Sequence, residues 1–169
     1  FQTVTGTIDT AAQYAAAVDA QFGPIAPLVK GVYAVNSDGE ANPVFIRLMT
    51  DVLFRCPTRT LARMTAAHDS SVYLYSFEEG MAFHAFELSY VFGPQFGFEP
   101  SYVPSTLTTM QNTWSQFVAK GTPNRRHLSP WPVYSTDGDQ HMVLKTPFTA
   151  SAGLEKTECD FWDAMQAAR

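Results

Sequence analysis

The stretch SVYLYSF, residues 71–77, is the feature that most constrains how this chain can fold. It is rich in β-branched and aromatic residues and apolar at nearly every position, which predicts a strand buried on both faces. Such a strand normally belongs to a parallel sheet of several strands. HMVLK, residues 141–145, predicts one further short strand. The sequence therefore predicts an α/β fold in which the rest of the sheet lies elsewhere.

Capping signals place helices in the first part of the chain. Thr10 followed by Gln13 is a capping-box pattern that opens a helix over residues 10–22, before Gly23. Asn42 and Pro43 are suited to the cap and first turn of a second helix, over residues 42–54.

Further helices are predicted beyond a proline that interrupts this pattern. Pro57 is expected to break or kink the path before a helix over residues 58–68. Ser105 is expected to cap a helix over 105–121, which ends at a glycine and leads into a loop. The final predicted helix, residues 153–168, places several apolar side chains on one face: Leu154, Cys159, Trp162 and Met165.

Composition excludes several classes of partner. The net charge is −5 and the 11 Lys and Arg residues are scattered, with only Arg125 and Arg126 adjacent, so no basic stripe predicts nucleic-acid or anionic-lipid binding. No apolar run has the length of a membrane-spanning helix. With 46% hydrophobic residues and no visible linker, residues 1–169 are predicted to form part of one globular domain.

The chain begins at Phe1, and its first residues, FQTVTGTIDT, lack the charged and apolar regions of a signal peptide. We expect a processed product or a fragment, so the missing signal peptide does not argue against secretion.

Several uncommon motifs occur in a fixed order. They are TDVLFRCP, VYLYSF, HAFELSYVFG, TMQNTWSQFVAKGTPN, WPVY and TECDFWDAM. In this order, over at least residues 50–165, the chain resembles the carboxyl-terminal third of the cholinesterase and type-B carboxylesterase family. The resemblance implies the carboxyl-terminal part of an α/β-hydrolase fold, with a serine, acid and histidine triad in that chain order.

His84, in HAFELSYVFG, matches the histidine of that triad. In the implied mechanism it takes a proton from the serine and later returns it to the leaving alkoxide. Taken alone, a histidine among apolar neighbours is more often a satisfied core residue. The surrounding motifs favour the catalytic interpretation.

Most of the implied machinery is missing from these residues. A triad enzyme of this fold needs a Gly-x-Ser-x-Gly elbow, and the 169 residues contain none. The implied partner is an amino-terminal portion of the same esterase, carrying the serine, the triad acid and the oxyanion hole. The substrate would be a small-molecule ester, and no cofactor is expected.

Two acidic residues are expected to play supporting roles. Glu87 lies so close to His84 in the chain that it has difficulty reaching the far nitrogen of the ring in line, so we do not assign it as the triad acid. The family resemblance implies a supporting position for it. A partly buried carboxylate bonded to backbone or to a hydroxyl is an equally good interpretation. Asp51 matches a family position and is expected to be structural. The other histidines, His68, His127 and His141, are expected to be solvated.

The two cysteines, Cys56 and Cys159, have no neighbouring Cys or His that would indicate a zinc site, so no metal is expected. On spacing alone they read as buried free thiols. The family resemblance instead implies a disulfide between them, and with it a secreted protein or another oxidising compartment.

The connection EEGMAF between Phe77 and His84 is shorter than in many members of the family. It predicts an open site in which Met81 and Phe83 contact the substrate, although both could equally pack beneath the loop. The acyl and alcohol specificity cannot be read from these residues.

Three hypotheses follow from the sequence. The favoured one is part of a serine carboxylesterase, and a covalently labelled serine on an accompanying chain would identify it. The second is a cholinesterase-like adhesion or binding protein, whose partner would lack that serine. The third is a stand-alone interaction domain, which predicts a monomer that unfolds cooperatively. Against the third, the apolar strand would be left with an uncovered edge.

Overall fold

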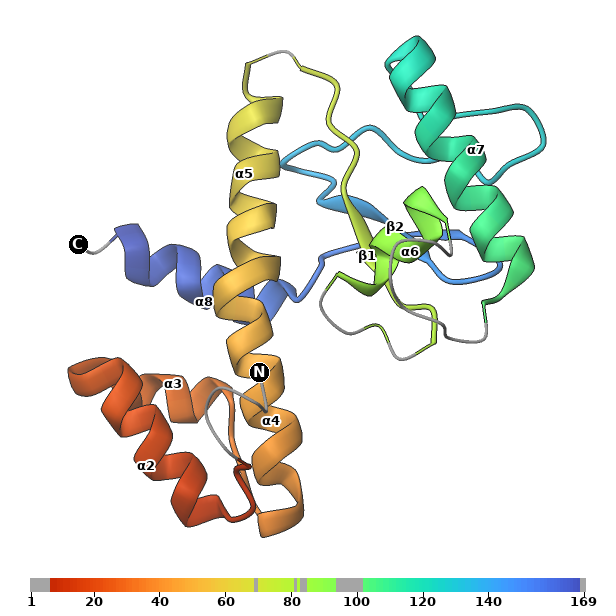
Figure 1. Ribbon diagram of the computed structural model, residues 1–169. Coiled ribbons are helices and arrows are strands. Elements are labelled where there is room, and N and C mark those ends of the chain that lie inside the picture. Colours follow the sequence, from red (N-terminus) through yellow and green to blue (C-terminus); the bar gives the residue numbers. More distant parts are fainter. Residues whose placement is uncertain (1–6, 69, 81, 83–84, 94–101, 168–169) are drawn as a thin grey trace. The chain divides into compact units, whose positions relative to one another are not determined.

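The computed structural model describes residues 7–68, 70–80, 82, 85–93 and 102–167. These residues form two compact units, one comprising Phe1–Thr58 with Glu155–Arg169 and the other comprising Arg59–Leu154. The first unit is helical, and the second carries the sheet (Figure 1).

The first unit begins with α2, Ala11–Phe22. Its predicted capping box is present, because Thr10 Oγ1 accepts from the Gln13 backbone and Gln13 Oε1 accepts from the Thr10 backbone. The helix ends at Gly23, whose φ of 52° favours a residue without a side chain. A 3₁₀ turn, Gly23–Ile25, and a helix that the sequence did not predict, α3, Ala26–Val32, then follow.

The next helix, α4, Asp38–Thr50, starts earlier than predicted. Pro43 therefore lies inside the helix, and the assignment of Asn42 and Pro43 to the cap and first turn was wrong. An acidic first turn supports the earlier start, because carboxylates there interact favourably with the helix dipole. Asp38 Oδ1 also accepts from the backbone of Ala11, so it caps α2 as well.

Helical conformation continues without a break after α4. The π-helical turn η2, Asp51–Arg55, leads directly into α5, Cys56–Ala66. The Cys56 N–H bonds to the Asp51 carbonyl, five residues back, and Pro57 follows within the first turn of α5. The predicted break at Pro57 is thus replaced by a π turn, a common way for a helix to absorb such a disruption.

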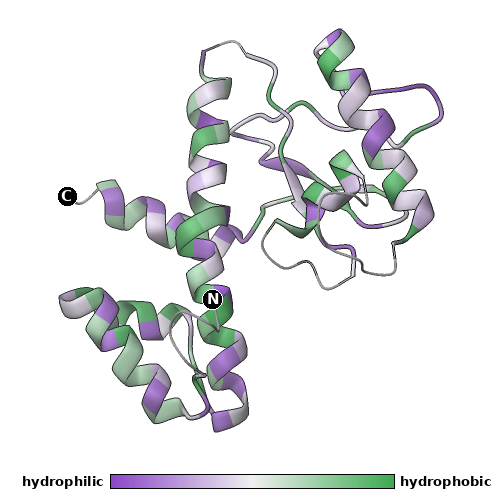
Figure 2. Cartoon of the chain, in the orientation of Figure 1, coloured by the Kyte–Doolittle hydropathy of each residue, from purple (hydrophilic) through white to green (hydrophobic). Residues whose placement is uncertain are grey.

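The helix α8, Lys156–Ala167, belongs to the same unit. Its Trp162 packs against the unit's core, which includes Val18, Val29 and Leu48. Figure 2 shows both hydrophobic and hydrophilic residues along α2 and α4, as expected for helices with one buried face. Leu154, expected on one face with Cys159 and Trp162, lies before the start of α8 and packs in the second unit.

The second unit contains a three-stranded sheet of order β1-β2-β3. The strands are β1, Tyr75–Phe77, β2, Gln140–Leu144, and β3, Thr149–Ala152. β1 and β2 are parallel, with Tyr75 opposite Met142, whereas β2 and β3 are antiparallel. Strands are therefore present at both predicted positions, although β1 covers only the end of the predicted stretch 71–77, and β1 has the expected parallel neighbour.

β1 and the residues before it separate two apolar clusters. Tyr73, Tyr75 and Phe77 pack with one cluster, which includes Met110 and Trp131. On the alternate positions, Val72 and Leu74 pack with a cluster that contains Ala62 and Ala66 of α5 and, from later in the chain, Tyr134 and Leu154. Both faces thus contact apolar side chains, but the odd-numbered face is only partly buried.

Two helices follow β1 in the chain. The sequence did not predict the short α6, Phe86–Phe92. The helix α7, Pro104–Lys120, ends as predicted at Gly121, with φ 71°. Its cap is Val103 and not Ser105, because Pro104 occupies the first turn, where its missing N–H costs nothing.

A buried ion pair stabilises the second unit. Arg59, 1% exposed, donates from Nε to Asp139 Oδ2 at 2.9 Å, and the Tyr134 hydroxyl donates to the same carboxylate. Burial alone would raise the pKa of Asp139, but the hydrogen bonds from Arg59 and Tyr134 outweigh it and hold the pKa below its usual value.

The observed architecture confirms the α/β prediction. Helices accompany a small open mixed sheet, as expected for part of an α/β-hydrolase domain. No helix in the described part of the chain is long and apolar enough to cross a membrane.

Candidate functional site

The segment after β1 carries the residues that the sequence analysis singled out for chemistry. Met81, Phe83 and His84 lie outside the described residues, so their assigned roles stay predictions. The described residues on either side show how the chain enters and leaves this segment.

The backbone around this segment adopts an unusual conformation. Ala82 has φ 39° and Ala85 has φ 66°, both in the left-handed region that residues with a β-carbon disfavour. Gly80, with φ 61°, occupies the same region at no steric cost. Strained alanines of this kind cost about 1–3 kcal/mol each and tend to cluster at functional sites. The strain therefore marks residues 80–85 as a candidate site.

Glu79 fixes the start of the segment. Its side chain is buried, and Oε2 accepts from Thr106 Oγ1 at 2.6 Å and from the Thr146 backbone at 3.1 Å. Glu78 adds a backbone bond from its N–H to the Leu144 carbonyl. The end of β1 is thereby tied to α7 and to the end of β2.

Sequence analysis missed Glu79. Two consecutive glutamates directly after an apolar strand, in FEEG, were the available signal. Nothing in the sequence shows that residues 106 and 146 lie within reach of the carboxylate.

Glu87 lies half-buried in the first turn of α6. Burial raises the pKa of Tyr75, and the negative charge of Glu87 raises it further. The two side chains are thus close enough to interact. The role assigned to Glu87, supporting His84, stays a prediction.

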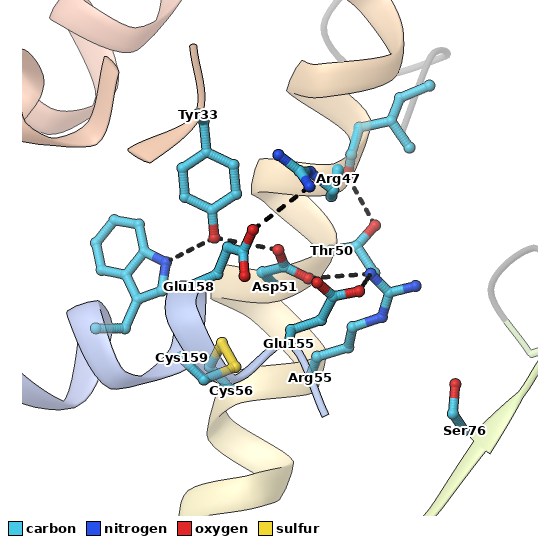
Figure 3. Close-up of polar contacts among 12 residues, drawn as sticks. Tyr33, Arg47, Thr50, Asp51, Arg55, Cys56, Ser76, Glu155, Glu158 and Cys159 are labelled. Carbon is cyan, nitrogen blue, oxygen red and sulfur yellow. Dashed lines mark hydrogen bonds and ion pairs between the residues drawn. A yellow bond between two sulfur atoms is a disulfide. The ribbon is translucent and has the colours of Figure 1, made fainter. Parts of the chain in front are cut away.

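Asp51 lies in the first unit, within a polar cluster formed by α4, η2 and α8 (Figure 3). The carboxylate is fully buried and accepts from the Tyr33 hydroxyl and from Arg55 Nη1, each at 3.1 Å. Trp162 Nε1 donates to the Tyr33 oxygen, also at 3.1 Å, and Arg55 reaches Glu155 as well. Asp51 thus links elements far apart in sequence.

Burial raises the pKa of Asp51, and the hydrogen bond and charge of Arg55 only partly offset this. Burial and the nearby charge of Asp51 likewise raise the pKa of Glu155. The positive charge of Arg55 therefore opposes the effect of burial on both carboxyls.

The disulfide between Cys56 and Cys159 lies beside this polar cluster, as Figure 3 shows. It joins the first turn of α5 to α8, with 5.0 Å between the two Cα atoms. The predicted pairing is therefore confirmed, and the alternative of two free thiols is wrong. Within the described residues, no group of three His, Cys, Asp or Glu side chains could hold a metal ion.

The remaining histidines differ from expectation at one position. His68 and His127 are exposed, as predicted, but His141 on β2 is only 5% exposed. Its Nδ1 has no hydrogen-bond partner among the described residues. Burial lowers the pKa of His141, although the charges of Glu78 and Asp139 oppose this. The prediction of a solvated His141 was wrong because its strand, β2, is the middle strand of the sheet and its side chain is buried there.

This burial predicts a pH dependence of stability. Unfolding exposes His141, whose pKa then returns to about 6.5, so below that pH the unfolded state binds a proton that the folded state excludes. The free energy of unfolding is expected to fall as the pH drops below 6.5. Urea unfolding at pH 7.5 and 5.5 checks this.

His141→Leu is the matched control, because leucine does not titrate. The raised pKa values of Asp51 and Glu155 act in the opposite direction, since the folded state then binds protons more readily. They act equally in both proteins, so the difference between the two isolates His141. Equal pH dependence in the wild type and the variant would contradict the assignment.

Comparison with known proteins identifies one family for most of the chain. The model of the carboxylesterase family matches residues 13–162. The chain is 28% identical over 165 residues to liver carboxylesterase from Sus scrofa, covering 84% of this chain and 29% of that protein. It is also 28% identical over 140 residues to para-nitrobenzyl esterase from Bacillus subtilis (strain 168), covering 75% of this chain and 27% of that protein. The chain thus spans less than a third of the length of these curated relatives.

Proposed function

This chain belongs to the carboxylesterase family, and we propose that it supplies the proton-carrying histidine, His84, for serine-dependent hydrolysis of carboxylic esters. The observation that carries the proposal is the family match over residues 13–162, which includes HAFELSYVFG. Family membership supports ester hydrolysis in general. The role of His84 rests in addition on its position in that motif.

The proposed reaction has two stages. A serine hydroxyl attacks the ester carbonyl carbon while His84 accepts the serine proton, and the resulting tetrahedral intermediate expels the alkoxide, which takes that proton from His84. Water then attacks the acyl-serine and gives a proton to His84. The second tetrahedral intermediate releases the carboxylic acid as His84 returns that proton to the serine oxygen. Histidine suits both steps because its ordinary pKa, about 6.5, lies near working pH.

The described residues support a positioned histidine. Strained alanines at 82 and 85 flank the position, and the anchored Glu79 fixes the strand end that precedes it. A catalytic side chain must be held close to its productive geometry, and an anchored, strained connection serves this purpose. In this proposal Glu87 supports the site, Asp51 has a structural role within the first unit, and Met81 and Phe83 contact the substrate.

The nucleophile is proposed to lie in an amino-terminal portion of the same esterase. None of the 169 residues forms a Gly-x-Ser-x-Gly elbow, so a complete triad requires residues from outside this sequence. Residues 1–169 would then be the carboxyl-terminal segment of a single α/β-hydrolase domain acting on small-molecule esters. The disulfide favours a secreted protein or another oxidising compartment.

Intact-mass analysis with a fluorophosphonate probe tests this proposal. The native, nonreduced protein is measured before and after treatment with the probe, which reacts with activated serines. We expect a polypeptide other than this 18.7 kDa segment, or a longer chain that contains it, to gain one probe mass. A folded, complete protein that gains no probe mass would overturn the proposal and favour a binding role.

A further inference from the structure

Two adjoining cavities lie beside α7 in the second unit. The smaller, about 170 Å³, is lined by five aromatic side chains, Tyr73, Tyr75, Trp114, Phe117 and Trp131. The larger, about 230 Å³, is lined in part by polar side chains, among them Thr109, His127 and Ser129. Thr113, Pro123 and Trp131 line both, so the two cavities meet.

The aromatic side chains of the smaller cavity contact one another edge to face. Tyr75 lies 5.4 Å from Trp114 and 6.1 Å from Trp131 between ring centroids, and Tyr73 lies 5.9 Å from Phe117. The angles between these ring planes are 73°, 88° and 79°. Aromatic rings favour this geometry because the positive edge of one ring meets the negative face of another. An additional ring of similar size can extend the same pattern.

The size and charge of the cavity select among ligands. A cavity of about 150 Å³ lined by apolar side chains holds benzene. Among the described residues, no Asp, Glu, Lys or Arg lines either cavity, so an organic ion would contact no charged side chain of this lining. Burial also raises the pKa of the Tyr75 hydroxyl, which keeps this wall neutral. A neutral single ring fits better than a cation.

We propose that this pair of cavities is a binding site for a neutral, monocyclic aromatic compound with a polar substituent. The ring occupies the cavity formed by Tyr73, Tyr75, Trp114, Phe117 and Trp131. The substituent points into the adjoining cavity, where Thr109, His127 and Ser129 offer hydrogen-bonding groups. Binding at this site does not depend on hydrolysis.

Binding of 4-fluorophenol to the purified protein, followed by fluorine NMR, tests the site. Phe117 is the best residue to change because it is 44% exposed, so Phe117→Ala removes one wall with little effect on folding. We expect saturable binding, with a Kd about 3- to 10-fold higher in Phe117→Ala, the range typical of one aromatic contact. The matched control is Val118→Ala, the neighbouring residue on α7, which is 84% exposed and lines neither cavity.

The position of the substituent is tested separately. The wild type is expected to bind 4-fluorophenol more tightly than fluorobenzene, and His127→Asn is expected to reduce that preference. Asparagine is chosen because His127 has φ 71°, a conformation that asparagine tolerates. An undiminished preference would overturn this orientation.

Tryptophan emission gives a readout that requires no change to the cavity. Two of the three tryptophans, Trp114 and Trp131, line the site, whereas Trp162 lies in the other unit. 4-Nitrobenzyl alcohol, a neutral nitroaromatic compound that quenches indole emission, is expected to quench the Trp162→Phe variant in a saturable way. Absence of saturable quenching, or equal fluorophenol affinity in Phe117→Ala and Val118→Ala, would overturn the proposal. Neither result depends on esterase activity.

Discussion

Replacing His84 by glutamine is expected to lower kcat/KM for ester hydrolysis by at least about a thousandfold. Glutamine can form hydrogen bonds but cannot take up a proton near neutral pH, so the serine would lose its general base. The expected loss is large because the same side chain serves in both acylation and deacylation. Steady-state hydrolysis of a chromogenic ester by the complete esterase measures it.

His68→Gln is the matched control for this experiment. His68 lies just beyond the end of α5 and is exposed, so the same substitution there should leave kcat/KM within about twofold of the wild type. The rate of serine labelling by the fluorophosphonate should fall in parallel with kcat/KM in His84→Gln. If His84→Gln keeps more than a tenth of the wild-type kcat/KM, His84 is not the proton carrier.

Removal of the disulfide is expected to lower the free energy of unfolding by about 2–5 kcal/mol. The bond joins cysteines that are 103 residues apart, and in the chain-entropy model closing a loop of this length restricts the unfolded chain strongly. The double variant Cys56→Ala with Cys159→Ala removes it. Both side chains are buried, so alanine replaces them without exposing a polar group.

Urea unfolding followed by the emission of Trp162 measures this loss within the first unit. Trp162 bonds to Tyr33 there, so its environment reports on the elements that the disulfide joins. A reductant should destabilise the wild type and leave the double variant unchanged, which separates the bond from the packing of the two side chains. A wild type whose unfolding midpoint does not move on reduction would contradict the prediction.

Local sequence signals located several elements correctly. The capping box at Thr10, the glycine after α7 and the position of β2 all depend on residues that are near one another in the chain. The errors arose where local signals compete or are weak. Asn42 with Pro43 resembles a helix start, but Asp38 and Glu40 provide an earlier one. Pro24 before α3 and Pro27 in its first turn concealed that helix, and the small residues of β3 concealed that strand.

For the candidate site, the sequence indicated the motif around position 84 and the structure supplied its surroundings. The anchoring of Glu79 depends on Thr106 and on the backbone of Thr146, residues that no short-range pattern connects to it. The burial of His141 has the same origin, since β1 and β3 flank its strand. The anchoring of Glu79 and the burial of His141 both depend on contacts that form only when the chain folds.

The sequence by itself determined the family of this protein and the helices with clear caps. Through the family resemblance it also determined the pairing of Cys56 with Cys159. Tertiary structure alone decided that Asp51 is a buried acceptor, that Arg59 pairs with Asp139, and that aromatic residues beside α7 enclose a cavity. The physical reason is the range of the interactions. Caps and turns are bonds between neighbours in the chain, whereas burial and the pKa shifts that follow from it depend on side chains brought together only by folding.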